Sequence, residues 1–342
     1  MRKLLLPFSW LYGVIIWLRN LFYDLDIFSA EKVSKPVISV GNITTGGSGK
    51  TPCVEYIVDM LLKDGHTPAV VSRGYSRKSK GVVVVSDGRG KYADVGQSGD
   101  EPLQIAKKFP KAIVIVGEKK VDAARKAVIL GADCIIADDA FQHRQFARTL
   151  DVVLCGEELA TGKNTLLPAG NGREPLGSLS RANIVLASSS DKNTVEKNLR
   201  RYSDAPFVLF GIAPLKILLS IRNETQSIEF IQNRRVFALT GIANPQRFLT
   251  TVSSMGGEVA GARHFGDHHW FTEAELTAVA AEARRLNAVI ATSEKDWQRI
   301  AGCRSLSVIL GETDLLVIQV AMKITHNEER FAALVRATAE IS

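Results

Sequence analysis

A glycine-rich segment that ends in lysine and threonine carries the clearest chemical signal in this sequence. Residues 39–52 read SVGNITTGGSGKTP, between a β-branched run and an apolar-periodic helix. The backbone N–H groups of such a loop, together with the positive end of the helix dipole, bind the phosphates of a nucleoside triphosphate. Lys50 is expected to reach the β- and γ-phosphates, and Thr51 to hold Mg²⁺ through its hydroxyl. The residues expected to surround the phosphates are Thr44, Thr45, Gly46, Gly47, Ser48, Gly49, Lys50 and Thr51.

This loop departs from the strict phosphate-binding pattern, because Thr44 stands where that pattern has glycine. Gly46, Gly47 and Gly49 still provide residues that adopt positive φ without strain. The alternative is a flexible glycine and serine turn that carries a surface lysine. The order strand, loop, helix favours the nucleotide site.

Two acidic side chains, Asp138 and Asp139, directly follow the apolar run 134–137. In proteins with a phosphate-binding loop, an aspartate at the end of a buried strand supports Mg²⁺, directly or through water. The alternative is a pair of solvated acids, but His143 and Arg144 crowd the same short segment. We therefore predict a metal site here.

A second acidic pair, Asp100 and Glu101, stands at the start of a predicted helix that runs to Lys108. Acids are common at this position for structural reasons, because they complement the helix dipole. Transfer of a phosphoryl group to a hydroxyl also needs a base and Mg²⁺ ligands near the γ-phosphate. Asp100 and Glu101 lie in the same half of the chain as the phosphate loop, so they could supply the base and a Mg²⁺ ligand.

Three of the six histidines, His264, His268 and His269, fall in one short segment with Asp267. Asp267 could orient His268 for catalysis. A zinc site would need further ligands, and no cysteine lies near. The Asp-His-His triplet also resembles manganese phosphoesterases, but the further aspartate motifs of those enzymes are not found here. A purely structural cluster remains an alternative.

Apolar runs alternate with helical periodicity along the first 206 residues, which indicates a parallel sheet covered on both faces. Ligands bind at the carboxyl ends of such strands, so the loops at Thr44, Arg73 and Asp138 should gather on one edge. The long loop 166–177 is expected to be functional. We predict an α/β fold with a P-loop NTPase-type parallel sheet domain and a second, smaller α/β domain joined by a β-strand hinge.

The predicted division of the chain follows the change in periodicity near residue 205. Two antiparallel strands, 206–211 and 216–221, are expected in the hinge, with a return strand at 315–323. Residues 292–296 are expected to form a loop. The predicted units are a P-loop kinase domain with an N-terminal membrane-associated helix (1–206), hinge strands (207–232), the smaller domain (233–313) and a return strand with a C-terminal helix (314–342).

Residues 4–18 are apolar and aromatic, with basic residues on both sides. Fifteen residues interrupted by Pro7 fall short of the roughly 20 that span a bilayer. A signal peptide is the rival, but no small-residue cleavage site follows. Tryptophan and tyrosine favour the headgroup boundary. We predict that residues 1–23 lie on a membrane surface, although a helix packed on the domain core is the alternative.

The composition is that of an ordinary globular protein of 342 residues, with 46% hydrophobic and 23% charged residues. A net charge of +7 suits anionic partners, which include phosphates, nucleic acid and acidic membranes. The four cysteines lack metal-site spacing and are interpreted as small buried residues in a reducing compartment, not as disulfides or zinc ligands.

Taken together, the chain resembles the tetraacyldisaccharide 4′-kinases, the lipid A kinases of Gram-negative envelope synthesis, over roughly residues 1–325. The motifs that carry the resemblance occur in order: GN at 41–42, TxGGSGKTP at 44–52, SRGY at 72–75, GDEP at 99–102, DDxFQHR at 138–144, LPAG at 167–170, REP at 173–175, TGIxNP at 240–245, FxDH at 265–268 and TxEKD at 292–296.

This resemblance implies ATP- and Mg²⁺-dependent phosphorylation of the 4′-hydroxyl of a tetraacylated glucosamine disaccharide 1-phosphate, which gives lipid IVA. It implies a peripheral enzyme on the cytoplasmic face of the inner membrane, and we expect a monomer that binds no nucleic acid. By similarity, Asp100 is the base and pairs with His268, while Thr51, Glu101, Asp138 and Asp139 hold Mg²⁺. Arg73, His143 and Arg173 are candidates for holding the substrate.

Two segments depart from the family pattern. Lys119-Lys120 stands where relatives often have Asp-Arg, and Asn171-Gly172 replaces a proline-rich approach to Arg173. Either change could alter phosphate contacts without changing the reaction.

Rival functions are a soluble P-loop ATPase or GTPase, a kinase acting on another small substrate, and a nucleotide-regulated membrane-binding module without chemistry. The Asn-Lys-x-Asp motif typical of guanine specificity is not found.

Overall fold

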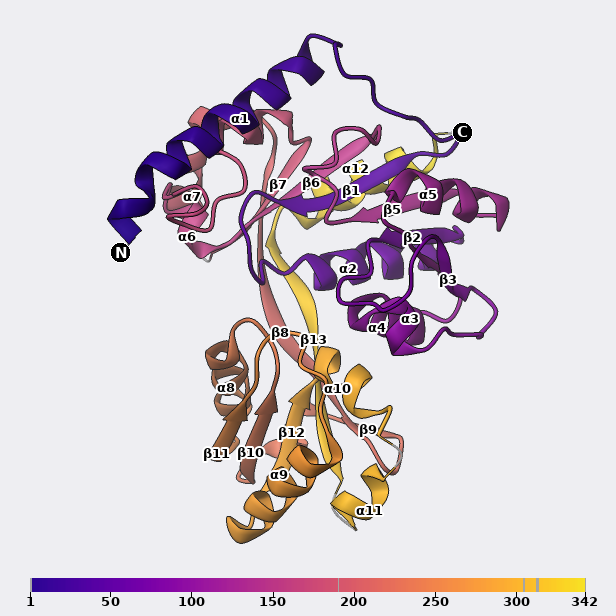
Figure 1. Cartoon of the computed structure of the whole chain (residues 1–342), viewed down its shortest axis with the longest axis vertical. Helices are drawn as coiled ribbons and strands as arrows, with labels where there is room; N and C mark the ends of the chain where they lie inside the picture. The colour runs from indigo at the N-terminus through magenta and orange to yellow at the C-terminus, as the bar shows by residue number, and fades with distance from the viewer. Residues whose placement is uncertain (1, 190, 304, 312–313, 342) are drawn as a thin grey trace.

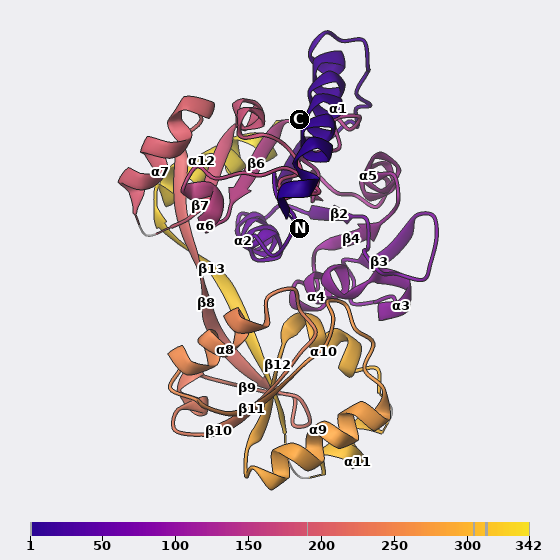
Figure 2. The same ribbon diagram turned by 60° about the vertical axis from the view of Figure 1, so that its left-hand side comes forward.

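The computed structural model describes residues 2–189, 191–303, 305–311 and 314–341. The chain folds into two lobes joined by two long strands, β8 (Phe207–Leu219) and β13 (Leu315–His326) (Figure 1, Figure 2). Met1, which belongs to the predicted membrane segment, lies outside the described residues.

The larger lobe contains seven neighbouring strands in the order β7-β6-β1-β5-β2-β4-β3. Their pairings are parallel except for β3, which runs antiparallel to β4 at the edge. Most of these strands read as continuous apolar runs because helices cover both faces of the sheet. The strands are β1 (Val37–Asn42), β2 (Pro68–Ser72), β3 (Val83–Asp87), β4 (Ile113–Val116), β5 (Cys134–Asp138), β6 (Leu150–Cys155) and β7 (Ile184–Ser188).

The helices of the larger lobe pack on both sides of this sheet. On one face lie α2 (Lys50–Lys63), α4 (Asp100–Lys108) and α12 (Glu328–Ala339), and α5 (Lys120–Ile129) lies on the other. The remaining helical segments are η1 (Arg2–Leu5), α1 (Leu6–Asp24), α3 (Val95–Ser98), α6 (Glu157–Ala160), η2 (Leu176–Arg181), α7 (Lys192–Leu199) and η3 (Arg200–Tyr202).

The smaller lobe continues the same sheet with the order β11-β10-β12-β13, and all these pairings are parallel. Its strands are β9 (Glu224–Gln226), β10 (Arg235–Thr240), β11 (Glu258–His264) and β12 (Val289–Ser293). Its helices are η4 (Ile228–Ile231), α8 (Pro245–Ser254), α9 (Glu273–Arg285), α10 (Glu294–Ile300) and α11 (Leu306–Leu310). One face is covered by α8 and η4, and the other by α9, α10 and α11.

The strands β8 and β13 form the waist between the lobes as one antiparallel pair. The start of β8 pairs with β7 in the larger lobe, and its end pairs with β9 in the smaller lobe. The predicted break between residues 211 and 216 is wrong, because β8 is a single strand. Pro214, which cannot donate to a strand ladder, is accommodated by a register shift opposite Gln319 and Val320.

The α/β class is confirmed, but the sheet is mixed and not purely parallel. In the smaller lobe one strand was not predicted and one expectation is wrong. Strand β11 has no counterpart in the sequence prediction, and the expected loop at 292–296 consists of the end of β12 and the start of α10. In α10, the Ser293 side chain accepts from the Asp296 N–H and so starts a helix directly after the strand. The division at residues 206, 232 and 313 stays a prediction.

Candidate active site

The phosphate loop lies between β1 and α2, at the edge of the sheet where β5 and β2 also end. Gly49 has φ +90° at the start of α2, and a Cβ there would lie 3.2 Å from the Phe210 ring of β8. Glycine is therefore required at this position both for backbone conformation and for packing against the waist. The expected gathering of the loops after β1, β2 and β5 on one edge is confirmed.

The glycine missing at position 44 is explained by the backbone. Positive φ occurs at Gly46 and Gly49 but not at Thr44. Thr44 is buried and forms an antiparallel bridge with Gly172, while the Thr45 N–H donates to the Asn171 carbonyl at 2.7 Å. The segment 164–174 thus contacts the phosphate loop through the backbone of Asn171 and Gly172.

The Lys50 ammonium lies beside two polar groups of the same edge. Its Nζ is 3.5 Å from Asp139 Oδ1 and donates to Asn42 Oδ1 at 3.3 Å. The Asn42 amide in turn donates to Ser48 Oγ at 2.8 Å. Lys50 is therefore held at the mouth of the phosphate loop, in a position suited to an anion.

Asp138 is the buried acid at the end of β5. One carboxylate oxygen accepts from Ser72 Oγ at 3.3 Å, and the other, Oδ1, is buried with no hydrogen-bond partner among the described residues. Burial, together with the charges of Glu101 and Asp139, raises the pKa of Asp138 to about 6, although Lys50 and Lys120 oppose the shift. A cation at this point would stabilise the charged carboxylate.

The donor set suits Mg²⁺, which prefers oxygen and binds through one or two carboxylates together with phosphate oxygens and water. The oxygen donors at this edge are the Thr51 hydroxyl and the Glu101, Asp138 and Asp139 carboxylates. Within the described part of the chain, no group of three or more His, Cys, Asp and Glu side chains forms a self-sufficient metal site.

A basic cluster borders the two aspartates. Arg173 Nη1 donates to both Asp139 oxygens at 3.0 Å, and Lys120 Nζ lies 2.9 Å from His143 Nδ1. Burial lowers the pKa of Lys120 to about 8, with Arg73 and Arg173 adding to the shift while Asp138 and Asp139 oppose it. Burial and the Lys120 charge lower the pKa of His143 to about 4, so its neutral ring accepts from Lys120.

Asp100 is the point where the two lobes meet in the site. Its Oδ2 is 3.0 Å from His268 Nδ1 and 3.5 Å from Arg299 Nε, both from the smaller lobe. Burial alone would raise the pKa of Asp100, but the hydrogen bond from His268 and the charges of Lys295 and Arg299 outweigh it and hold the pKa below its usual range. The carboxylate is thus deprotonated at neutral pH and able to accept a proton.

Gly99 places Asp100 close to the loop after β2. Its φ is +82°, and a Cβ there would lie 2.9 Å from the Tyr75 carbonyl oxygen. This close approach sets the start of α4 against the segment that carries Arg73. Tyr75, Asp100, His268, Trp270 and Arg299 line a small pocket between the lobes.

Lys295 completes the contact across the lobes. Its Nζ lies 3.3 Å from Glu101 Oε1, 3.2 Å from Asp267 Oδ1 and 3.1 Å from His268 Nε2. Since Lys295 can only donate, His268 Nε2 accepts and Nδ1 carries the proton that faces Asp100. Burial would lower the pKa of Lys295, but Glu101, Asp100 and Asp267 together raise it.

The structure brings most of the predicted residues into this one region. Lys50 of the phosphate loop forms an ion pair with Asp139, and Glu101 forms one with Lys295. The charges of Lys50 and Glu101 both act on the pKa of Asp138. Sequence reasoning missed the roles of Asn42, Lys120, Lys295 and Arg299. Three of them had a signal: Asn42 lies in the GN motif, Lys120 departs from the family pattern, and Lys295 lies within TxEKD.

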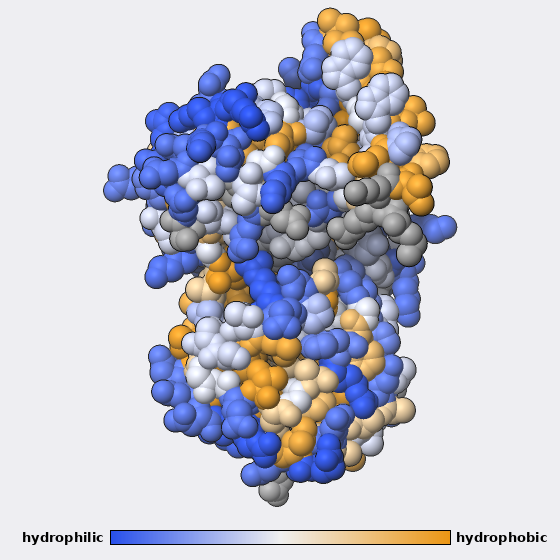
Figure 3. Space-filling model, turned by 90° about the vertical axis from the view of Figure 1, so that its left-hand side faces the viewer, coloured by the Kyte–Doolittle hydropathy of each residue, from blue (hydrophilic) through white to orange (hydrophobic). Residues whose placement is uncertain are grey.

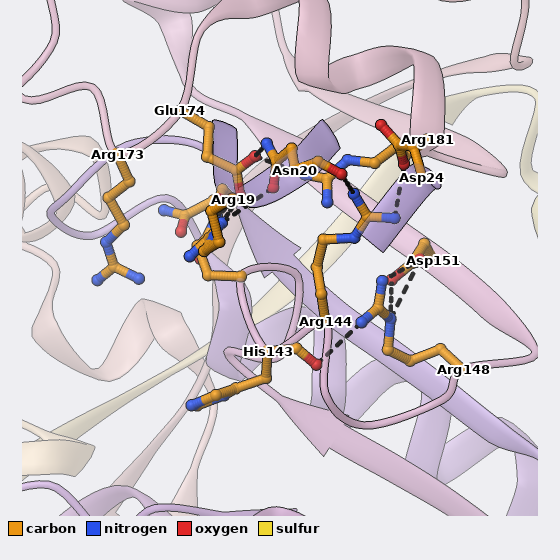
Figure 4. A network of polar contacts seen from close by, with 12 residues as sticks. Arg19, Asn20, Asp24, His143, Arg144, Arg148, Asp151, Arg173, Glu174 and Arg181 are labelled. Carbon is orange, nitrogen blue, oxygen red and sulfur yellow. Dashed lines mark hydrogen bonds and ion pairs between the residues drawn. The ribbon is translucent and has the colours of Figure 1, made fainter. Parts of the chain in front are cut away.

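Helix α1 is tied to this site by a network of polar contacts around Glu174 (Figure 4). The Glu174 carboxylate is fully buried and accepts from Arg181 at 2.6 Å, Asn20 at 3.0 Å and Gln142 at 3.2 Å. The Tyr12 hydroxyl donates to the Arg173 carbonyl at 2.9 Å. One face of α1 therefore binds the segment that carries Arg173.

The opposite face of α1 is exposed and apolar. Figure 3 shows apolar side chains gathered at the edge of the molecule that α1 occupies. Trp10 and Trp17 are 74% and 58% exposed. Among the residues that the structure describes, no helix combines the length and apolarity needed to cross a membrane. The packed face confirms the alternative of a helix packed on the domain, and the membrane contact of the exposed face stays a prediction.

Known proteins of one family match this chain over most of its length. The family model described as tetraacyldisaccharide-1-P 4′-kinase matches residues 1–340. A tetraacyldisaccharide 4′-kinase of Chlorobaculum tepidum is 38% identical over 325 residues, covering 89% of this chain and 92% of the relative. That of Chlorobium phaeobacteroides is 36% identical, covering 98% of this chain and 97% of the relative.

A solved structure is similar over the same length. The crystal structure of LpxK from Aquifex aeolicus in complex with ATP has a TM-score of 0.80 and 31% sequence identity. The match covers 98% of this chain and 99% of that chain. The similarity therefore includes both lobes and the waist.

Proposed function

Because the chain belongs to the tetraacyldisaccharide-1-P 4′-kinase family, we propose that it transfers the γ-phosphate of ATP to the 4′-hydroxyl of a tetraacylated glucosamine disaccharide 1-phosphate. The product would be lipid IVA, in lipid A biosynthesis. The observation that carries the proposal is the position of Asp100, a deprotonated carboxylate held by His268 and Arg299 beside the phosphate-loop edge.

In this reaction Lys50 and the loop N–H groups bind the ATP phosphates, and Asp100 accepts the proton of the attacking hydroxyl. A bond forms between the 4′-oxygen and the γ-phosphorus, the bond from that phosphorus to the bridging oxygen breaks, and ADP leaves with the electron pair. Phosphoryl transfer requires mainly positioning and electrostatic stabilisation. His268 and Arg299 supply positioning, since both hold the Asp100 carboxylate from the other lobe.

We propose Thr51, Glu101, Asp138 and Asp139 as the residues that hold Mg²⁺, supported by the unpaired buried Asp138 oxygen. When bound, Mg²⁺ supplies charge neutralisation at the phosphate oxygens. Arg73 and Arg173 are proposed to hold the substrate phosphate. His143 would act through Lys120, whose ammonium it orients.

A direct test measures ADP release with ATP and Mg²⁺, in the presence and absence of the acylated disaccharide. The proposed kinase should release ADP only slowly without lipid and should place the phosphate on the lipid when it is present. A soluble ATPase or GTPase would release inorganic phosphate at the same rate in both cases, and that result would reject the proposal.

We also propose that the enzyme binds the cytoplasmic face of the inner membrane as a peripheral monomer, through the exposed face of α1. The lipid substrate resides in a bilayer, and α1 is attached to the segment that carries Arg173. Docking of α1 would therefore present the substrate to the site.

The α1 proposal predicts that Trp10→Ser with Trp17→Ser lowers partition into phospholipid vesicles by about tenfold or more. Both side chains are exposed, so the fold should persist. Vesicle co-sedimentation measures the effect. Val308→Ser is the matched control, because Val308 is an apolar residue 82% exposed on the smaller lobe. Equal partition of all three proteins would show that α1 does not bind the membrane.

A further inference from the structure

A buried charged cluster lies at the junction of the two lobes, away from the phosphate loop. We call Glu55, Lys108 and Glu294 the junction cluster. Glu55 comes from α2, Lys108 from α4 and Glu294 from α10 of the smaller lobe, and β13 passes beside them (Figure 1). The catalytic scheme above uses none of the three.

Lys108 connects the members of the junction cluster. Its Nζ donates to Glu55 Oε2 at 2.7 Å, to Glu294 Oε1 at 3.5 Å and to the Val320 carbonyl at 3.4 Å. Gln104 donates to the other Glu55 oxygen at 2.7 Å, and the Val320 N–H donates to Glu294 Oε2 at 3.1 Å. Each carboxylate oxygen and both backbone groups of Val320 thus have a partner.

Strand β13 binds the junction cluster through the backbone of Val320. Val320 lies at the register shift between β13 and β8, opposite Pro214, where a strand ladder is interrupted. Its peptide groups therefore bond to Glu294 and Lys108. The junction cluster consequently fixes three helices to the strand that joins the lobes.

Each arm of the cluster belongs to an element that carries proposed site residues. Glu55 is one turn after Thr51 on α2, and Lys108 is on the helix that begins with Asp100. Glu294 begins α10, which supplies Lys295 and Arg299 to Glu101 and Asp100. A shift of α10 relative to α4 would therefore separate the groups that hold Asp100.

We propose that Glu55, Lys108 and Glu294 are positioning residues, which hold the smaller lobe in the register where His268, Lys295 and Arg299 contact the Asp100–Glu101 pair. The inference rests on the proposed function for its catalytic consequence, but the structural role stands on the contacts alone. Removing one partner leaves a buried charge uncompensated, so the cluster is sensitive to single changes.

The cluster also makes the junction dependent on pH. Burial and the charge of Glu55 raise the pKa of Glu294 to about 7, although Lys108 and the Val320 N–H oppose the shift. Glu294 would have an ordinary, lower pKa if the lobes separated and exposed it to water. The joined state therefore binds the proton more strongly, and contact between the lobes weakens as pH rises from the ordinary pKa of a glutamate to about 7, with little further change above it.

The test compares the wild type with Lys108→Met, Glu294→Gln and the control Lys107→Met, whose target is the exposed neighbour on α4. Lys108→Met should lower kcat by about tenfold or more, with the KM for ATP within about twofold, because two buried carboxylates then face each other. Glu294→Gln keeps the shape and the Val320 contact. It should abolish a decline of kcat that approaches about tenfold per pH unit below about 7 in the wild type, between the ordinary pKa of a glutamate and that of Glu294, and that levels off at higher pH.

Hydrogen exchange of the α10 amides provides a readout that needs no turnover, and melting temperature reports folding. Faster α10 exchange in Lys108→Met, with Lys107→Met unchanged, supports the inference. If Lys108→Met does not fold, the pH profile and the α10 exchange of Glu294→Gln test the positioning role in its place. If the folded variants have the same kcat, the same pH profile and the same α10 exchange as the wild type, the three residues are not positioning residues. If the wild type does not phosphorylate the lipid, the proposed function is rejected. The positioning role is then tested by the α10 exchange alone.

Discussion

Replacing Asp100 with asparagine is expected to lower kcat for lipid phosphorylation by about 10²–10⁴-fold, the usual contribution of a positioned base. The amide has the size of the carboxylate and its oxygen can still accept from His268, but it cannot take the proton of the hydroxyl. Because Asp100 is distinct from the phosphate loop, the KM for ATP should change little. Steady-state kinetics with saturating lipid measure both constants.

Asp267→Asn is the matched control, since Asp267 contacts Lys295 and His268 at the edge of the same network but not Asp100. Its kcat should stay within about fivefold of the wild type, as expected for a partly exposed ion pair. An Asp100→Asn enzyme with near-normal kcat would show that another group accepts the proton. The lowered pKa of Asp100 also predicts that no loss of activity arises from its protonation near neutral pH.

Lys50→Ala is expected to lower kcat/KM for ATP by about 10²–10³-fold, the effect of losing one oriented donor at the site of charge development. The side chain is held by Asn42 and Asp139 at the mouth of the phosphate loop. Arg173 would continue to hold Asp139, so the fold of the site should persist. Initial rates at varied ATP concentration test this.

Lys63→Ala provides the comparison at the opposite end of α2, where the ammonium forms only an exposed pair with Asp59. That variant should behave as the wild type. Retention of normal kcat/KM by Lys50→Ala would mean that the loop does not bind the transferred phosphate, and the assignment of the nucleotide site would then be wrong.

Local features of the fold were largely predictable from the sequence. The strand, loop and helix around Lys50, and the helix from Asp100 to Lys108, depend on short-range apolar periodicity, and the structure has them as expected. The sequence prediction had two strands, 206–211 and 216–221, in place of β8, and Pro214, which cannot donate to a strand ladder, lies between them. Only the long-range pairing of β8 with β13 shows that the strand continues through Pro214.

The site was predictable to the extent that its residues lie in recognisable motifs. The pairing of Asp100 with His268 came from the family resemblance, because two residues 168 positions apart in the sequence give no local signal of contact. Arg299 lies outside every quoted motif and reaches Asp100 only because α10 begins directly after β12. The contacts of Lys108 with Glu55 and Glu294 likewise depend on how the lobes meet.

The most direct test of the proposed reaction is to locate the transferred phosphate. The enzyme is incubated with γ-labelled ATP, Mg²⁺ and the tetraacyl disaccharide 1-phosphate, and the lipid product is analysed by mass spectrometry and ³¹P NMR. The account predicts one new phosphate monoester on the 4′-oxygen, and its loss in Asp100→Asn. Label found only as inorganic phosphate, or attached to the existing 1-phosphate, would contradict it.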